Sequence, residues 1–266
     1  RVSGGVANRW GTPSYQREAV TFRMGGQTEL AEGWFLGGTA AYGFDSTSGN
    51  AGSSNGDTID GGIALKRSHG PWYFAAGLNV GYNWYDESRT VALGGVPFRL
   101  DSTSSVLTVG GRLRAAYEFA FEGFYLRPFA DLDLLFSHLP GHTESGPQGV
   151  ALHLREENEF TVGFSPMLEA GGRLDLGQGW QLRPYAAAGL LLLSNDSFAS
   201  HGSLSGAPAG AGTFRVESDA PDILGRVRLG AELYAPQNFD FRAEYDLQSG
   251  KDYLAQSGSL RLEYRF

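Results

Sequence analysis

The sequence predicts an all-β fold: a closed antiparallel transmembrane β-barrel of twelve strands, with residues 1–266 forming a single domain. Three observations predict it. Apolar and polar residues alternate at every second position through long segments, which is the period of a β-strand. Aromatic residues gather at both ends of the apolar faces, as they do at the two membrane–water interfaces of barrels. Short and long connections alternate strictly along the chain, and the long ones are rich in Gly and Ser.

The alternation is most regular over residues 72–84. Its even positions, from Trp72 to Trp84, are apolar, whereas the odd positions between them are mostly small or polar. No helical period fits this segment. The same pattern, with charges on the polar face, recurs over residues 20–30, 107–119 and 239–247.

The composition excludes several classes of protein. The chain has no cysteine, so neither a disulfide framework nor a thiolate metal site can form. A net charge of −8, with arginines scattered singly or in pairs, argues against nucleic-acid binding, which needs a clustered basic face. The longest apolar run, Ala186–Leu193, is well short of the roughly 20 residues that a membrane helix needs. Residue 1 does not begin a signal peptide, so we expect a processed or excised part of a longer protein.

The expected strands and connections define an orientation. Outer-membrane barrels have short periplasmic turns and long external loops. The first strand should therefore run outward, and both chain ends should lie on the periplasmic side of the cell outer membrane. The strands are expected near residues 1–10, 18–30, 34–46, 57–67, 71–86, 102–119, 123–137, 158–176, 180–194, 222–235, 238–248 and 254–266. The short turns are 31–33, 68–70, 120–122, 177–179 and 236–237, and the long extracellular loops are 44–56, 87–101, 137–157 and 195–221.

Two physical constraints refine this arrangement. An even number of strands lets an antiparallel barrel close, and closure is needed because unpaired backbone groups find no water in lipid. Pro128 and Pro184 fall inside predicted strands. Because proline cannot donate to a ladder, we expect both at bulges near the periplasmic rim.

Several segments carry the motifs of a known family. Residues 258–266, GSLRLEYRF, place Tyr264 and the terminal Phe266 on one face and resemble an outer-membrane assembly signal. Residues 238–246, NFDFRAEYD, resemble the penultimate strand of type V autotransporter β-barrels. The segments LRPFA at 126–130 and LRPYA at 182–186 are similar to a Pro-aromatic-Ala element of that family, and RVSGG at 1–5 resembles its first strand. The resemblance covers essentially the whole chain.

The resemblance to autotransporter C-terminal translocator domains implies a function and a set of partners. Such a domain is embedded in the lipid bilayer of the outer membrane, mediates export of its own N-terminal passenger to the cell surface, and depends on the barrel assembly machinery. The family also has a linker helix in the lumen before the first strand. We expect Arg1 to begin a strand already, and we therefore expect the linker helix and any cleavage chemistry to lie outside this chain. The alternative is a stand-alone outer-membrane porin or small-solute channel.

No cofactor, catalytic residue or metal site is predicted, and the chain is not expected to be an enzyme. His201-Gly202-Ser203 is the nearest approach to a histidine–serine pair, but it has no evident orienting partner in the sequence. We expect a flexible surface loop there. Three histidines and three glutamates share one long connection without the short spacing of metal ligands: His138, His142 and His153 with Glu144, Glu156 and Glu157.

Charged residues on the polar faces are the candidate functional residues. They should line the lumen, where opposite charges on neighbouring strands can pair and keep the interior hydrated. A subset is expected to contact a threaded helix or passenger segment as well. Glycines on the same faces either make room for such a segment or permit strand curvature: Gly37, Gly77, Gly81, Gly171 and Gly189. The lumen-facing set is Arg23, Glu29, Arg112, Arg114, Glu118, Arg127, Asp131, Asp133, Glu169, Arg173, Arg226, Arg228, Glu232, Arg242, Glu244, Arg261 and Glu263.

Overall fold

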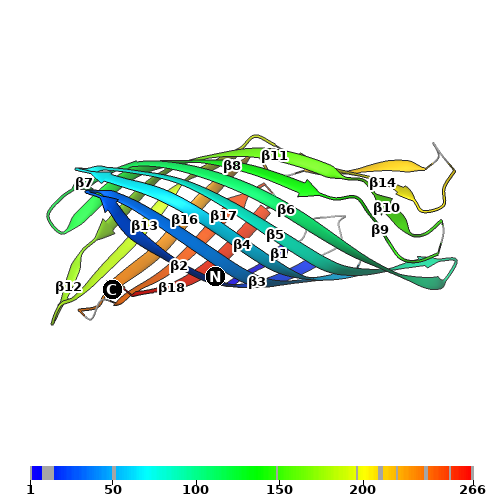
Figure 1. Ribbon diagram of the computed structural model, residues 1–266, viewed down its shortest axis with the longest axis horizontal. Helices are drawn as coiled ribbons and strands as arrows, with labels where there is room; N and C mark the ends of the chain where they lie inside the picture. The colour runs from blue at the N-terminus through cyan, green and yellow to red at the C-terminus, as the bar shows by residue number, and fades with distance from the viewer. Residues whose placement is uncertain are drawn as a thin grey trace.

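A computed structural model describes residues 2–7, 15–49, 52–147, 149–195, 197–208, 212–219, 221–236, 239–251 and 253–264 (Figure 1). The main sheet consists of β1 (Val2–Ala7), β2 (Tyr15–Ala31), β3 (Trp34–Gly49), β4 (Gly52–His69), β5 (Trp72–Leu93), β6 (Val96–Tyr117), β8 (Phe124–Leu139), β11 (Glu157–Gly172), β13 (Trp180–Leu193), β16 (Ile223–Tyr234), β17 (Phe239–Gly250) and β18 (Tyr253–Tyr264). Two short strands, β7 (Phe119–Ala120) and β12 (Leu174–Gly177), belong to the same sheet and pair with β8 and β13.

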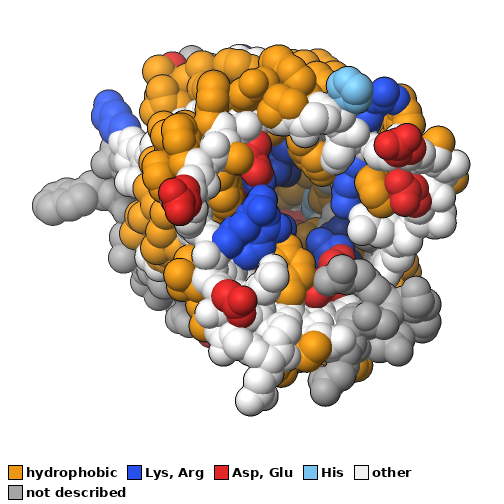
Figure 2. All heavy atoms as spheres, turned by 90° about the vertical axis from the view of Figure 1, so that its left-hand side faces the viewer, with side chains coloured by type: hydrophobic (Ala, Val, Ile, Leu, Met, Phe, Trp, Pro, Cys, Tyr) orange, Lys and Arg blue, Asp and Glu red, His pale blue; other side chains and the backbone are white. Residues whose placement is uncertain are grey.

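Neighbouring strands of the main sheet pair antiparallel. Their order is β11-β13-β16-β17-β18-β1-β2-β3-β4-β5-β6-β8, and β8 also pairs with β11. The strands slant across a curved sheet that encloses a hollow (Figures 1 and 2). The predicted all-β antiparallel fold is confirmed.

In the part of the chain that the structure describes, no α-helix has the length and hydrophobicity of a membrane-spanning helix.

Large apolar side chains cover the outer surface of the sheet, while charged side chains gather inside the hollow (Figure 2). Phe22, Met24 and Leu78 keep 68%, 77% and 62% of their surface exposed. Soluble monomers rarely expose contiguous apolar surface on this scale. Because successive side chains of a strand point to opposite faces, the alternation read from the sequence becomes an apolar exterior and a polar interior.

The hairpin between β5 and β6 corrects one predicted loop. The expected connection at 87–101 is instead strand, because β5 continues to Leu93 and β6 begins at Val96. Gly94 and Gly95 form the turn, with φ values of +59° and +82°. A two-residue hairpin turn with both φ angles positive matches the twist of the flanking strands, and glycine adopts it without strain. Most of the expected loop at 44–56 is also strand. β3 continues to Gly49 and β4 begins at Gly52, and these two glycines are paired across the hairpin.

The two other predicted loops contain a second sheet. Its strands are β9 (His142–Thr143), β10 (Leu152–Leu154), β14 (Ser197–Leu204) and β15 (Thr213–Asp219), in the order β15-β14-β10-β9. A glycine allows the strands to pack, because Leu154 and Phe214 lie against the position where Gly202 would carry a Cβ. The expectation of loops throughout 137–157 and 195–221 is therefore wrong, since local Gly and Ser content did not prevent strand pairing.

The prolines expected at bulges lie in strands of continuous register. Pro128 pairs with Leu168 and Pro184 with Ala231, without a shift. On the other side of each proline the ladder is interrupted and then resumes in the same register. The first gap separates β6 from β7, and the second separates β11 from β12. A missing N–H removes ladder bonds on one side only, so the neighbouring strand breaks and no residue is inserted.

Two interior tyrosines lie over glycines on the neighbouring strand. A Cβ on Gly171 would overlap the ring of Tyr125, and a Cβ on Gly230 would overlap the ring of Tyr185. The predicted interior glycines thus divide into two kinds. Gly171 makes room for an aromatic ring, and Gly189 makes room for the backbone of Pro166, whereas a Cβ on Gly77 would meet nothing closer than 3.6 Å.

Replacing Gly171 with alanine should destabilise the fold by about 1–3 kcal/mol, the usual cost of overpacking, because the added methyl must displace the Tyr125 ring. Denaturant unfolding of the protein refolded in phospholipid vesicles would measure the loss. Gly77→Ala is the matched control and should change the unfolding free energy far less. Equal losses in the two variants would show that the tyrosine–glycine contact has no particular role.

Candidate functional site

The interior of the curved sheet is the candidate site, and strand register assembles its charges into pairs. On β6 and β8, Arg112 lies opposite Asp133 and Arg114 lies opposite Asp131. Arg112 Nε approaches Asp133 Oδ1 at 2.5 Å, and Arg114 donates two hydrogen bonds of 2.6 Å to the two Asp131 oxygens. Two parallel bonds of this kind fix both position and orientation. Asp131 has no exposed surface, so this pair is enclosed within the interior.

A second cluster lies where the proline gaps interrupt the ladders. Arg127 contacts Glu118 and donates to Glu169 at 2.9 Å, and the Tyr125 hydroxyl also donates to Glu169 at 2.9 Å. Arg173 approaches Glu118 at 3.4 Å. Glu118 and Arg173 are the residues between the interrupted strand segments. The two breaks in regular pairing are thus joined by an ion pair.

A third cluster lies on β16 and β17. Arg226 and Arg228 share Asp246, with N–O distances of 2.8 Å and 3.3 Å. Arg242 contacts Glu232 at 3.1 Å and Glu244 at 2.8 Å. Buried charges are stable only when they are paired and hydrogen-bonded, and these arginines and carboxylates satisfy one another.

The remaining predicted residues lie outside these three clusters and make fewer contacts. Arg23 pairs with Asp60 at 2.7 Å, and Arg261 contacts Glu263 two positions along β18. Glu29 accepts a hydrogen bond from the Gly33 amide at 3.0 Å, which places it at the β2–β3 turn rather than in a cluster. The side chain of Tyr264 and all of Phe266, the proposed assembly signal, lie outside what the structure describes.

Sequence reasoning missed several interior partners. Asp60, Asp246, Arg183, Tyr125 and Tyr185 all occupy the inward positions of their strands. Strict parity along the strands would have found four of them, because Tyr125, Arg183, Tyr185 and Asp246 each lie an even number of residues from a predicted interior residue of the same strand. No residue of β4 was predicted to face the interior, so Asp60 is known only from its contact with Arg23. Tyr185 donates to Glu244 at 2.7 Å and accepts from Arg242 at 3.1 Å, so it is as much part of the network as the charges.

A cavity of about 590 Å³ opens at the end of the molecule that carries the short turns. Arginines and glutamates of the second and third clusters line it, together with Tyr125 and Tyr185. An apolar cluster of Ala116, Phe129, Met167 and Ala187, with Tyr73 packed against it, adjoins the cavity. Tyr73, Ala116 and Phe129 form part of the cavity lining. Such a lining offers donors, acceptors and charges of both signs to a polar segment, but it places no activated nucleophile beside a base.

At the opposite end, the segment after β9 is fixed to the β5–β6 hairpin. Arg89 binds Glu144 with two bonds of 2.5 and 2.7 Å, and the Leu152 amide donates to Glu144 at 2.7 Å. Burial alone would raise the pKa of Glu144, but these hydrogen bonds outweigh it and hold the pKa below its usual value. Leu100, only 1% exposed, packs against the position where Gly146 lacks a side chain.

The histidine–serine motif has an orienting partner that the sequence did not reveal. His201 Nδ1 lies 2.7 Å from Glu157 Oε1, and this hydrogen bond lowers the pKa of Glu157. His201 and Ser203 belong to β14, so the expected flexible loop is a strand. No hydrogen bond joins Ser203 to His201 within the part of the chain that the structure describes, and no group of three metal-ligating side chains lies there.

An antiparallel sheet with an apolar outer surface and a charged interior defines the class of outer-membrane β-barrels. Within that class, the family model of the autotransporter β-domain matches residues 1–246, so the chain belongs to the autotransporter β-domain family. It is the outer-membrane translocator domain of a type V autotransporter. Among curated proteins, none is similar enough in sequence to match the chain.

Solved structures show the same fold. The translocator domain of the autotransporter NalP from Neisseria meningitidis superposes with a TM-score of 0.75 at 16% identity, over 100% of this chain and 86% of that one. The β-domain of the Bordetella autotransporter BrkA gives 0.64 at 18% identity, over 98% and 93%. The transport unit of AIDA-I from Escherichia coli gives 0.62 at 16% identity, over 100% and 89%.

Replacing Asp131 with alanine should lower stability by about 3–5 kcal/mol, because Arg114 would remain in the interior without its partner. Guanidinium unfolding in vesicles would measure the change. Replacing both partners with apolar residues, Arg114→Met with Asp131→Leu, should recover much of the loss. Glu217→Ala, which removes an exposed pair with Arg215, is the control and should have little effect. A small effect of Asp131→Ala would contradict the structural role of the pair.

Acid should release the segment that Glu144 holds. A carboxyl group whose pKa is lowered by folding stabilises the native state above its unfolded pKa, and this contribution disappears as the pH falls through the lowered value. The amides of Ala151 and Leu152 should therefore be protected from hydrogen exchange at neutral pH and lose protection below the usual pH range of glutamate titration. Glu144→Gln should exchange faster at neutral pH and lose that pH dependence. Equal exchange in both proteins at neutral pH would refute the prediction.

Proposed function

We propose that this chain forms one domain, a closed barrel of twelve strands, with both termini on the periplasmic side. The pairing of β8 with both β6 and β11, and of β1 with both β2 and β18, supports closure. The short turns that join β2 to β3 and β4 to β5 and the long β5–β6 hairpin support the orientation, because barrel turns are short on the periplasmic side.

The barrel anchors the protein and offers its own N-terminal passenger a polar route to the cell surface, without acting as an enzyme or needing a cofactor. The single observation that carries this proposal is the enclosed, paired charge network of the interior, inside an apolar exterior, in a member of the autotransporter family. A linker helix preceding residue 1 is the proposed lumen occupant. Assembly requires the outer-membrane barrel machinery, with Tyr264 and Phe266 as its signal. The family match favours this function over a stand-alone porin or channel.

The predicted interior residues divide into two roles. Asp131, Glu169 and Arg228 are at most 8% exposed, so they hold the wall together. Arg23 and Arg112 keep 51% and 50% of their side chains exposed, although each has an acidic partner. An arginine whose side chain is half exposed to the lumen can exchange a hydrogen bond to its acidic partner for one to a passing segment. This exchange leaves neither charge buried without a partner or water. These two are the proposed contacts for the passenger or its linker.

A reporter joined through a helical linker upstream of Arg1 should become accessible to protease on intact cells when the fusion is expressed in a host with an outer membrane. The variant Arg23→Gln with Arg112→Gln should slow this exposure severalfold, while the barrel still folds and shows its shift on heating. Arg99→Gln removes an exposed charge outside the lumen and is the control. If the barrel assembles and the reporter never reaches the surface, the proposal fails.

A further inference from the structure

The outer surface of strands β3 to β6 changes character abruptly towards their shared hairpin end. One row across the four strands is Tyr42, Ile59, Tyr82 and Leu107, and the next is Phe44, Asp57, Trp84 and Ser105. The first is apolar and the second is mixed, with the Tyr42 hydroxyl donating to Asp57 at 2.7 Å. Aromatic rings with polar tips at this position mark the membrane–water interface.

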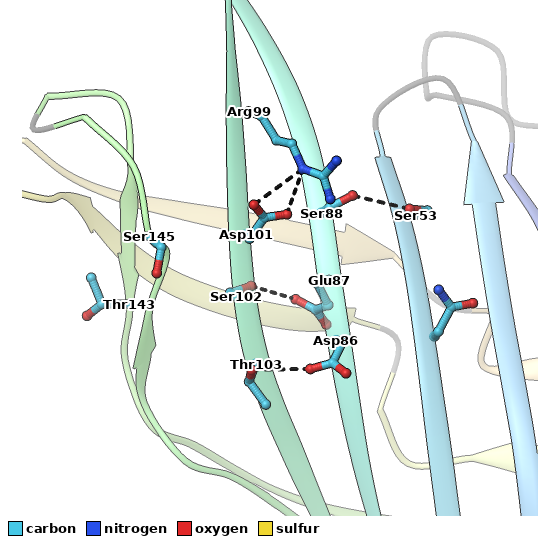
Figure 3. Close-up of a pocket in the computed structure, with 11 residues that line it drawn as sticks. Ser53, Asp86, Glu87, Ser88, Arg99, Asp101, Ser102, Thr103, Thr143 and Ser145 are labelled. Carbon is cyan, nitrogen blue, oxygen red and sulfur yellow. Dashed lines mark hydrogen bonds and ion pairs between the residues drawn. The ribbon is translucent and has the colours of Figure 1, made fainter.

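Beyond the aromatic rows, two further rows face the same way and contain no apolar residue. The first is Ser46, Asn55, Asp86 and Thr103, and the second is Ser48, Ser53, Ser88 and Asp101. We call these eight residues the outer polar panel. Figure 3 shows part of it, with Asp86, Ser88, Asp101 and Thr103 side by side on β5 and β6. A cavity of about 530 Å³ lies against the panel, with Arg99, Thr143 and Ser145 on its border.

The side chains of the panel are held in place by one another. Ser46 donates to Asn55 at 2.9 Å, Thr103 donates to Asp86 at 3.3 Å, and Ser53 and Ser88 are 3.3 Å apart. Arg99 donates to Asp101 at 3.0 Å. Groups already ordered in this way lose less entropy when a ligand binds. Hydroxyl, amide and carboxylate groups together provide donors and acceptors. Among the described residues that line the cavity, the only cation is Arg99, and it is already paired with Asp101.

We propose that the outer polar panel binds the uncharged sugar residues of the glycolipid headgroup in the outer leaflet. The panel is made of groups that match vicinal hydroxyls, which both donate and accept. Phosphate recognition would need an excess of arginine or lysine, and the carboxylates of Asp86 and Asp101 oppose it. The chemistry therefore selects the sugars of the headgroup and not its phosphates.

The height of the panel identifies the occupant further. Its two rows lie roughly 7 and 13 Å beyond Trp84 along the strand, or about 5 and 10 Å along the membrane normal once a tilt of about 40° is included. Phospholipid headgroups occupy only about 5–8 Å on each side of the hydrocarbon core. The second row therefore extends past a phospholipid headgroup, into the layer that oligosaccharide fills. This step depends on the membrane orientation proposed above.

Titration calorimetry on the purified, refolded barrel in detergent tests the inference. The probe is a lipopolysaccharide core oligosaccharide stripped of its acyl chains and phosphates, with inorganic phosphate as the second probe. The oligosaccharide should bind and phosphate should not. Asp86→Asn with Asp101→Asn should weaken oligosaccharide binding about tenfold, the effect of losing two hydrogen bonds of ordinary strength. Glu217→Gln removes an exposed carboxylate from another strand and should leave binding unchanged.

A second measurement separates a membrane glycolipid from a free saccharide. The thermal unfolding midpoint in bilayers should be higher with full-core lipopolysaccharide than with the same lipid lacking its core sugars, and the double variant should remove the difference. The inference is overturned if the wild type binds no oligosaccharide, if it binds phosphate instead, or if the double variant binds oligosaccharide as well as the wild type. It is also overturned if the unfolding midpoint is the same with and without the core sugars. None of these readouts requires export, so failure of the reporter to reach the surface would count against the translocator proposal alone.

Discussion

Every backbone N–H and C=O that faces hydrocarbon must find a partner within the protein, because no water is present to replace it. This constraint explains why the chain consists of antiparallel strands, each hydrogen-bonded along nearly its whole length. It also explains how the two prolines near the short turns are accommodated. Pro128 and Pro184 keep their pairing on one side and interrupt only the neighbouring ladder, at the end with the short turns. A break there lies close to the aqueous boundary, where the freed groups are least costly.

Strand pairing also determines the interior chemistry. Once the turn before β8 is placed, the register brings Arg112 to Asp133 and Arg114 to Asp131. The same ladder that satisfies the backbone therefore neutralises the charges that keep the interior polar. Where the ladder fails, Glu118 and Arg173 pair with each other across the two gaps. Charge pairing and backbone hydrogen bonding thus stabilise the same sheet. The glycines under Tyr125 and Tyr185 leave room for these two rings to pack in the interior.

The sequence predicted the strands and their two faces well, because a period of two is a local property. It predicted the hairpin end poorly. Residues 197–219 are rich in Gly and Ser, and residues 87–101 contain the pair Gly94-Gly95 followed by Pro97. Local features of this kind are typical of loops. The strand structure of these residues comes from pairing with distant segments, such as β10 with β14, and that information is not local. The orienting partner of His201 was missed for a similar reason. Glu157 lies 44 residues from His201 in the sequence and contacts it only through the fold.

The extended hairpins change how the hairpin end of this translocator can act. A flexible loop would present its polar groups in many arrangements, whereas a paired strand fixes them at intervals of about 7 Å on one face. The β5–β6 hairpin is further stiffened by the ion pair between Arg89 and Glu144 and by the packing of Leu100 against Gly146. The outer polar panel is therefore a continuation of the membrane-spanning wall, built on the same register as the aromatic rows beneath it. Within three rows, this rigid wall changes from apolar to aromatic to hydroxyl-rich residues, which matches the layers of an asymmetric membrane. That match would resist displacement of the barrel along the membrane normal while a passenger passes through it.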